Sequence, residues 1–290
     1  LYMSPYLQLI KMNITILVVI TSYLGYYLGL RYMDFIMVEY ESWIIFLYLI
    51  SGTFISSSGA CILNQYFEVE YDKKMNRTKL RPLPTGTIKL KNALILGLFL
   101  SFLGPFILLK INFLTSLISV LTILIYIIVY TPLKRYSSFN TIIGAIPGAL
   151  PPLGGWVAAT NEINIQGMLL FGILFCWQIP HFYSLAIIYK EDYKLGGFKM
   201  LPGNANSSNM VNFQIIFFTM ALIYSSIGIY ILNLTSFIYV VGAVLLGLIF
   251  LIYSSIIIFD YSSQAVKNIF IFSIIYLPSL LLLILIDSFF

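Results

Sequence analysis

The stretch SWIIFLYLISGTFISSSGACILNQYF, residues 42–67, contains no charged side chain. Each residue of an α-helix advances the chain by about 1.5 Å, so about 20 apolar residues cross a hydrocarbon core about 30 Å thick. This stretch is therefore long enough to span a lipid bilayer as one helix, and it predicts a membrane protein.

The rest of the chain has the same character. Of its 290 residues, 60% are hydrophobic and 9% are charged, whereas soluble domains average about 45–50% apolar and about 25% charged residues. This composition excludes an ordinary water-soluble fold and predicts an all-α polytopic membrane protein, with residues 1–290 forming a single transmembrane domain. We predict nine transmembrane helices near 12–30, 42–66, 92–109, 113–133, 138–160, 165–189, 209–232, 236–259 and 268–286.

Lysine and arginine are unevenly distributed between the loops. Most of the sixteen cations follow the second, fourth, sixth and eighth predicted spans. Short cytoplasmic loops accumulate Lys and Arg, so these loops and the N-terminus are predicted to be cytoplasmic. The net charge of +5 is then a topology signal and does not indicate nucleic-acid binding.

A polar stretch, NQYFEVEYDKKMNRTKLRPLPTG at 64–86, begins at the end of the second span. If the helix continues through it, Asn64, Glu68 and Asp72 share one face, because residues four apart lie one above the other. Mg²⁺ takes oxygen ligands from one or two protein carboxylates and completes its shell with water and substrate phosphate. The spacing suits such a site, whereas Glu70 points elsewhere and receives no role.

The alternative is a solvated juxtamembrane loop whose charges only satisfy the positive-inside rule. That reading does not explain an acidic pair where cations are expected, followed by Arg77, Lys79 and Arg81. Lys134 and Arg135 follow the fourth span and Lys190 follows the sixth. Three loops on one side of the membrane could thus converge on one anionic group, with polar loops at about 64–91 and 190–205.

A second polar cluster lies in WQIPHFYSLAIIYKEDYKLGG, residues 177–197, and contains the only histidine of the chain, His181. Asp192 follows about three helical turns later, which would place both residues on one face of a continuous helix. An ionisable residue within a span suggests a functional site. His181 could instead bond a neighbouring helix, and Asp192 could belong to a solvated loop.

The fifth span contains Pro147, Gly148, Pro151, Pro152, Gly154 and Gly155. Irregular backbone is tolerated at membrane depth where it lines a cavity, so this series predicts either a cavity wall or a kink that serves helix contacts. Cys61 and Cys176 lie within spans and are expected to be free thiols with a structural role.

The two polar stretches, together with YTPLKRYSSFNTIIGAIPGALPPLGGW at 130–156, carry a family resemblance. They resemble the UbiA-type intramembrane aromatic prenyltransferases and, within them, the protoheme IX farnesyltransferases or haem O synthases, over roughly residues 10–287. Many members carry two Asp-rich motifs. Asn64, Glu68 and Asp72 match the first, whereas in the second His181 stands where a carboxylate often occurs and only Asp192 clearly remains.

The resemblance implies nine helices around a central cavity that opens laterally to lipid. It also implies transfer of the farnesyl group of farnesyl diphosphate to the 2-vinyl group of haem b, with addition of water, giving haem O for haem-copper oxidases. The implied setting is a bacterial-type plasma (inner) membrane, with haem A synthase or a terminal oxidase as a possible assembly partner.

The resemblance further suggests roles for individual residues. Glu68, Asp72 and Asp192 would hold Mg²⁺, and Asn64 would orient the metal or its water. His181 would ligate the haem iron or act as an acid or base near the vinyl carbon. The residues expected to bind the diphosphate are Arg77, Lys79, Arg81, Lys134, Arg135 and Lys190.

Two other functions fit part of the pattern. A prenyltransferase for another aromatic acceptor, such as a quinone precursor, would use the same diphosphate chemistry. A membrane transporter would also have many spans, but its charges should lie near the bilayer midplane. Here the carboxylates lie at one end of a span beside cations, which favours phosphate chemistry.

Overall fold

The structure, a computed structural model, describes residues 4–35, 40–203 and 208–287. Within these ranges the chain is helical and contains no strand, and nine segments are long and apolar enough to cross a membrane. The predicted all-α fold and all nine spans are confirmed, and residues 204–205 of the predicted polar loop lie outside the described ranges. The nine segments are Met12–Tyr32, Glu41–Asp72, Leu90–Leu108, Phe113–Tyr136, Asn140–Thr160, Ile165–Ile188, Asn209–Ile231, Phe237–Phe259 and Ser263–Asp287.

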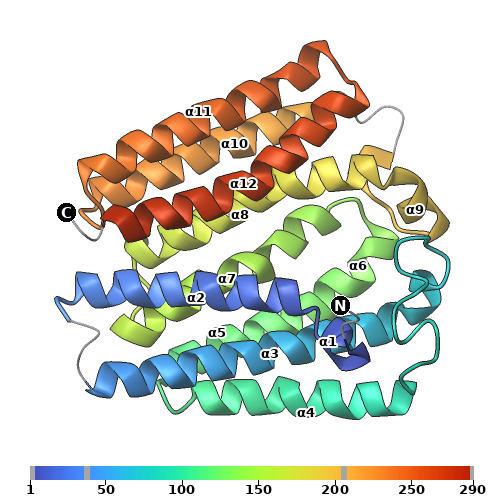
Figure 1. The fold of residues 1–290 in the computed structure, drawn as a ribbon, viewed down its shortest axis with the longest axis horizontal. Coiled ribbons are helices and arrows are strands. Elements are labelled where there is room, and N and C mark those ends of the chain that lie inside the picture. Colours follow the sequence, from blue (N-terminus) through green and yellow to red (C-terminus); the bar gives the residue numbers. More distant parts are fainter. Residues whose placement is uncertain (1–3, 36–39, 204–207, 288–290) are drawn as a thin grey trace.

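The helices form two groups that meet along α7 and α8 (Figure 1). In the first group α2 contacts α3 and α7, α3 contacts α4, and α5 contacts α4 and α7. In the second, α8, α10, α11 and α12 pack against one another. The elements are α1 (Pro5–Leu9), α2 (Met12–Tyr32), α3 (Tyr40–Asp72), α4 (Leu90–Leu108), α5 (Phe113–Leu124), a π-helical segment (Ile125–Tyr130), α6 (Thr131–Tyr136), α7 (Asn140–Thr160), α8 (Ile165–Ile188), α9 (Lys190–Leu195), a 3₁₀ turn (Leu201–Gly203), α10 (Ser208–Ile231), α11 (Phe237–Phe259) and α12 (Ser263–Asp287).

Helix α3 is longer than a bilayer crossing requires. Its 33 residues extend over about 50 Å, against a hydrocarbon core of about 30 Å. The helix therefore continues through the polar stretch as predicted and ends at Asp72, whose carbonyl accepts a hydrogen bond of 2.9 Å from the Thr78 hydroxyl. The chain then turns back over residues 73–89 before α4 begins at Leu90.

Helices α2 and α7 approach each other closely because glycines lie at their contact. A Cβ atom on Gly155 would lie 1.8 Å from the Ser22 carbonyl oxygen, and one on Gly25 would lie 1.9 Å from the Pro152 oxygen. Only a hydrogen atom fits at either position. Helix α7 runs unbroken from Asn140 to Thr160 despite its three prolines, so the irregular backbone considered for the fifth span is not observed.

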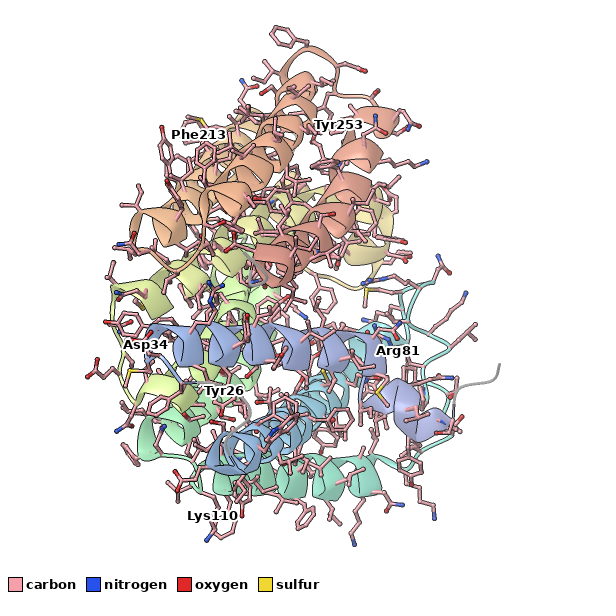
Figure 2. The ribbon with its side chains drawn as sticks, turned by 60° about the vertical axis from the view of Figure 1, so that its left-hand side comes forward. Tyr26, Asp34, Arg81, Lys110, Phe213 and Tyr253 are labelled. Carbon is pink, nitrogen blue, oxygen red and sulfur yellow. The ribbon has the colours of Figure 1, made fainter. Side chains whose placement is uncertain are left out.

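The outer surface of the bundle is apolar between two polar ends. Phe102, Phe213 and Leu245 are 77%, 67% and 57% exposed, and Figure 2 shows Phe213 on the outside of the second group. Figure 2 also places Arg81 at one end of the bundle and Asp34 and Lys110 at the other. Large exposed apolar surfaces of this kind mark contact with a membrane or a partner, and together with the spans they indicate a lipid-facing belt.

Candidate active site at the polar end of an internal cavity

A cavity of about 460 Å³ lies between the first helix group and α8, bounded by α2, α3, α5, α7 and α8. Most of its wall is apolar, and polar side chains gather where α3, α6 and the following loops meet. Figure 1 shows α1, the 73–89 loop, α6 and α9 at this same end of the molecule. The sequence-predicted residues on the cavity wall are Asn64, Glu68, Asp72, Arg77, Arg81, Lys134 and His181.

Glu68 forms an ion pair with Lys134 of α6. The Lys134 Nζ lies 2.7 Å from the Glu68 Oε1, and the two side chains are 15% and 6% exposed. The same Nζ lies 4.5 Å from the centroid of the Tyr130 ring. An ammonium held between a carboxylate and an aromatic face keeps its charge at the cavity wall.

Asp72 forms a second ion pair, one turn further along α3. Its Oδ2 accepts a hydrogen bond of 2.8 Å from the Arg81 Nη1, and its side chain is 1% exposed. The pair forms because the loop after α3 folds back toward the helix. The hydrogen bond from the Thr78 hydroxyl to the Asp72 carbonyl holds the loop at the helix end. The two carboxylates predicted to bind metal thus each face one cation.

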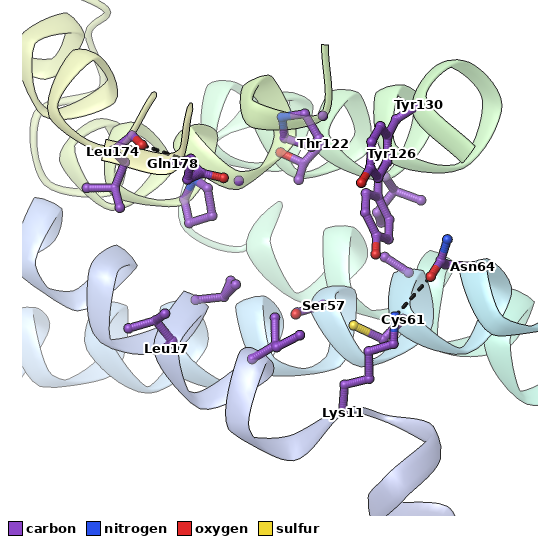
Figure 3. A pocket seen from close by; sticks show the side chains of 18 of the residues that line it. Lys11, Leu17, Ser57, Cys61, Asn64, Thr122, Tyr126, Tyr130, Leu174 and Gln178 are labelled. Atoms are coloured by element: carbon purple, nitrogen blue, oxygen red, sulfur yellow. Dashed lines mark hydrogen bonds between the residues drawn. The ribbon is translucent and has the colours of Figure 1, made fainter. Parts of the chain in front are cut away.

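Asn64 completes the face of α3 and connects two further elements. Its Nδ2 donates to the Thr131 Oγ1 at 3.1 Å, and its Oδ1 accepts from the Lys11 Nζ at 2.9 Å (Figure 3). Lys11 was not among the predicted site residues, so this contact was missed. Burial lowers the pKa of the Lys11 amine from its ordinary value. The available signal was a single lysine immediately before the first span.

The loop after α3 contacts α9 and the end of α8. Both carboxylate oxygens of Asp192 accept backbone N–H groups at 3.1 Å, one from Asn76 and one from Arg77. The Arg77 guanidinium lies 5.0 Å and 5.6 Å from the ring centroids of Tyr189 and Tyr193. Asp192 therefore fastens the loop after α3 to α9, a structural task that the sequence did not suggest.

One geometric expectation about this cluster is wrong. Helix α8 ends at Ile188, and α9 begins at Lys190 after a non-helical Tyr189. His181 and Asp192 therefore do not share a face of one continuous helix. Tyr189 breaks the helical backbone with φ −104° and ψ 28°. The number of residues between His181 and Asp192 therefore does not determine whether their side chains face the same way.

Three predicted cations lie off the cavity wall. Lys79 is exposed and donates to the Asn76 Oδ1 at 2.8 Å. Arg135 stacks over Tyr71, with the guanidinium carbon 4.0 Å from the ring centroid, and Lys190 is exposed. Their contacts with a diphosphate stay a prediction. Glu70 also faces away from the cavity, and it pairs at 2.7 Å with Lys73.

His181 lies on the cavity wall and also bonds a neighbouring helix. Its Nδ1 is 2.8 Å from the Ser273 Oγ of α12. The imidazole stacks with Trp177 and Phe270, with ring centroids 5.1 Å apart in both pairs and interplanar angles of 18° and 26°. The structure therefore confirms the contact with a neighbouring helix while leaving the ring on the cavity wall.

Aromatic and small residues shape the rest of the wall. Tyr126 and Tyr130, both in the π-helical segment, stack with ring centroids 5.5 Å apart (Figure 3). Such segments occur frequently at functional sites. A Cβ on Gly144 would lie 2.3 Å from the Tyr130 ring, and one on Gly148 would lie 2.0 Å from the Gln178 Oε1. The glycines of α7 thus make room for side chains on the cavity wall, as one reading of the fifth span predicted.

Comparison with known proteins identifies the family. The model of the UbiA prenyltransferase family matches residues 18–276. The chain belongs to the UbiA prenyltransferase family. A protoheme IX farnesyltransferase of Solibacter usitatus is 38% identical over 295 aligned positions, which cover 98% of this chain and 99% of the relative.

Two solved structures have the same fold. One is described as a digeranylgeranylglyceryl phosphate synthase, with a TM-score of 0.82, 20% identity and coverage of 98% of this chain and 97% of that one. Another is a UbiA homologue from Archaeoglobus fulgidus bound to GPP and Mg²⁺, with a TM-score of 0.64, 16% identity and coverage of 97% and 99%. The predicted fold and family resemblance are both confirmed.

Proposed function

We propose that this chain transfers the farnesyl group of farnesyl diphosphate to the 2-vinyl group of haem b, with addition of water, to form haem O. One observation carries the proposal. Two carboxylates one turn apart on α3, each facing a cation, close the polar end of a mostly apolar cavity in a UbiA fold. The full-length likeness to a protoheme IX farnesyltransferase supports haem b as the acceptor.

The carboxylate pair fits a magnesium ion. Glu68 and Asp72 both line the cavity and offer hard oxygen ligands, the type that Mg²⁺ takes from proteins before adding water and phosphate. These two residues would hold the ion, and Asn64 would orient a bound water. Bound Mg²⁺ supplies positive charge that stabilises the diphosphate as a leaving group. Asp192 is engaged by two backbone N–H groups, so we assign the ion to α3 alone.

The cations of the site have two tasks. In the structure, Lys134 and Arg81 neutralise the buried carboxylates. In the substrate complex they donate to phosphate oxygens instead, and Lys11 and Arg77 approach the same anion from the N-terminus and the loop. One opposite-charge contact at 4 Å is worth about 4 kcal/mol at an effective dielectric constant near 20. Several such contacts would stabilise the departing diphosphate substantially.

The cavity wall beyond the polar end protects the reacting carbon. An allylic cation forms as the carbon–oxygen bond breaks, and water would capture it. Tyr126, Tyr130 and Trp177 line the cavity, and the faces of aromatic rings attract a cation. An apolar chamber also excludes bulk water. These residues would keep the cation available to the vinyl group of the acceptor.

Orientation and setting follow from the charges. The cation-rich loops gather at the end of the bundle that holds the carboxylates, and the positive-inside rule assigns this end to the cytoplasm. We propose that the chain lies in a bacterial-type inner membrane with a cytoplasmic N-terminus. Haem A synthase or a terminal oxidase would be the partner that receives the product.

The experiment that tests the function uses the full chain purified in detergent or nanodiscs. Haem b, farnesyl diphosphate and Mg²⁺ are added, and the pigment is identified by mass while released pyrophosphate is measured. Formation of haem O with matching pyrophosphate release is the expected result. Prenylation of a quinone precursor in place of haem b would overturn the proposed acceptor. Absence of pyrophosphate release with every acceptor would overturn the enzymatic function and favour a transporter.

A further inference from the structure

The contact between His181 and Ser273 determines which imidazole nitrogen carries the proton. The Ser273 Oγ lies 2.8 Å from the His181 Nδ1 and 2.6 Å from the Phe270 carbonyl oxygen. A carbonyl oxygen can only accept, and a serine hydroxyl has one hydrogen to donate. The hydroxyl hydrogen therefore goes to Phe270, and the serine oxygen is left as an acceptor toward the ring.

The protonation state of the neutral ring follows from this count. The Nδ1 must carry the hydrogen, because two lone pairs facing each other at 2.8 Å would repel. In a neutral imidazole the second nitrogen is then an acceptor. The Nε2 has no hydrogen-bond partner among the described residues. It is also absent from the buried side-chain atoms of those residues that lack a partner, so it is not fully enclosed by protein. Since His181 lines the cavity, its bare nitrogen is accessible there.

The surroundings hold the ring and the serine in one arrangement. Ser273 is fully buried, and its backbone carbonyl accepts a 2.8 Å hydrogen bond from the Trp177 Nε1. Trp177 lies one turn before His181 on α8 and stacks against its ring, while Phe270 stacks against it from α12. Two side chains of α8, those of Trp177 and His181, thus form hydrogen bonds with Ser273 of α12, which limits both the position and the rotation of the imidazole.

We infer that Ser273 is a positioning residue that fixes His181 as the Nδ1–H tautomer and thereby presents a bare Nε2 to the iron of the haem substrate. The inference rests on the proposed function for the identity of that ligand. Metal-binding histidines typically donate their other ring N–H to an oxygen, which sets the tautomer and raises the basicity of the ligating nitrogen. The α8–α12 contact has this arrangement, with a serine oxygen as the acceptor.

The single histidine makes the tautomer directly measurable. Full-length protein labelled with ¹⁵N-histidine and purified without a histidine tag gives signals from His181 alone. We expect a proton on Nδ1 and none on Nε2 in the wild type, and a shift toward the Nε2–H form in Ser273→Ala. A wild-type proton on Nε2, or the same tautomer in both proteins, would overturn the inference without any reference to catalysis.

Haem binding supplies the second readout. Ferric haem b is titrated into the detergent-solubilised protein and followed by its Soret band and low-spin signal. Ser273→Ala should weaken binding by about ten- to a hundredfold, Ser273→Thr should restore most of it because the hydroxyl is retained, and His181→Ala should lose the nitrogen-ligated spectrum. Binding of farnesyl diphosphate should stay unchanged in Ser273→Ala.

Ser254→Ala is the matched control. Ser254 is also fully buried in the second helix group and bonds the Thr219 hydroxyl at 3.1 Å, away from the cavity wall. Ser254→Ala should leave both the haem spectrum and the haem affinity at their wild-type values. Equal spectra for Ser273→Ala and Ser254→Ala would overturn the inference, whereas a wild-type protein that binds haem but forms no haem O would overturn only the proposed function.

Discussion

Lys134 and Glu68 meet at 2.7 Å, and their contact joins α6 to α3 at the polar end of the cavity. Arg81 and Asp72 form the same kind of contact one helical turn away. The charges of the site are therefore paired within the protein: each carboxylate available to a metal is neutralised by a cation available to a phosphate. Removing one partner of such a pair is expected to affect stability and catalysis in separable ways.

The carboxylates of α3 are expected to be essential for transfer. Glu68→Gln and Asp72→Asn should each lower farnesyl transfer by about 10²–10³-fold, the range measured when one preorganised electrostatic contact to a transition state is removed. Glu70→Gln is the control, because Glu70 lies on the same helix but is exposed and pairs with Lys73. The measurement is haem O formation against Mg²⁺ concentration, and wild-type activity in Asp72→Asn at low Mg²⁺ would contradict the metal role.

Lys134→Met is expected to destabilise the fold as well as the reaction. It leaves Glu68 almost fully buried without a counter-charge, and breaking a buried pair costs about 3–5 kcal/mol. The double variant Glu68→Gln with Lys134→Met should recover much of this stability while remaining inactive. Thermal unfolding in detergent measures the first effect and pyrophosphate release the second. An active double variant would show that the pair only supports the fold.

Lys11→Met is expected to weaken diphosphate binding and to change its pH dependence. Burial lowers the pKa of Lys11, so the unfolded chain holds this proton more tightly than the folded one. The charge therefore opposes folding at neutral pH, and stability from this group rises as pH increases through the lowered pKa. An anion favours the protonated amine, so substrate affinity should fall over the same interval.

In Lys11→Met this fall in affinity should vanish, and the melting temperature should stay equal or rise. The KM for farnesyl diphosphate between neutral and alkaline pH is the quantity to measure. Lys110→Met serves as the control, because Lys110 is at the opposite end of the bundle (Figure 2). An unchanged pH profile in Lys11→Met would remove Lys11 from the site.

Two adjacent glycines of α7 should respond oppositely to alanine. A Cβ at position 155 would lie 1.8 Å from the Ser22 oxygen of α2, whereas one at 154 would meet its nearest atom, the Ile118 Cγ2, at 3.5 Å. Gly155→Ala should therefore force α2 and α7 apart and lower the melting temperature sharply. Gly154→Ala should be neutral or stabilising by up to about 1 kcal/mol, because alanine favours helix. Similar melting curves would contradict the close approach.

Asp192→Ala tests the structural task of this carboxylate. Losing the acceptor for two backbone N–H groups should release the loop at 73–89, so limited proteolysis there should accelerate, while Mg²⁺ affinity changes little. Asp192→Asn retains one acceptor oxygen, so its rate of proteolysis should lie between those of the wild type and Asp192→Ala. A large loss of Mg²⁺ affinity with unchanged proteolysis would instead support a second metal position.

The helical architecture follows from local properties of the chain. Each span is set by an apolar length that exceeds the hydrocarbon thickness, and this length can be read from the sequence without knowing any neighbour. The common face of Asn64, Glu68 and Asp72 is equally local, because it depends only on helical periodicity. Both predictions are confirmed, and α3 continues to Asp72.

The family resemblance rested on motifs that are local as well, and the family match confirms it. One expectation that failed was the shared face of His181 and Asp192. It assumed a helical phase across Tyr189, where the backbone leaves the helix. A polar sequence near a membrane surface does not determine whether a helix continues.

The partners of the site residues were decided only by tertiary structure. The contacts of Lys11 with Asn64 and of His181 with Ser273 join positions 53 and 92 residues apart, and periodicity carries no information at that separation. Which cations reach the cavity and which turn outward depends on how loops fold back over the helix ends. Membrane spans are determined by solvation of each segment alone, whereas pairing of buried charges depends on every helix that surrounds them.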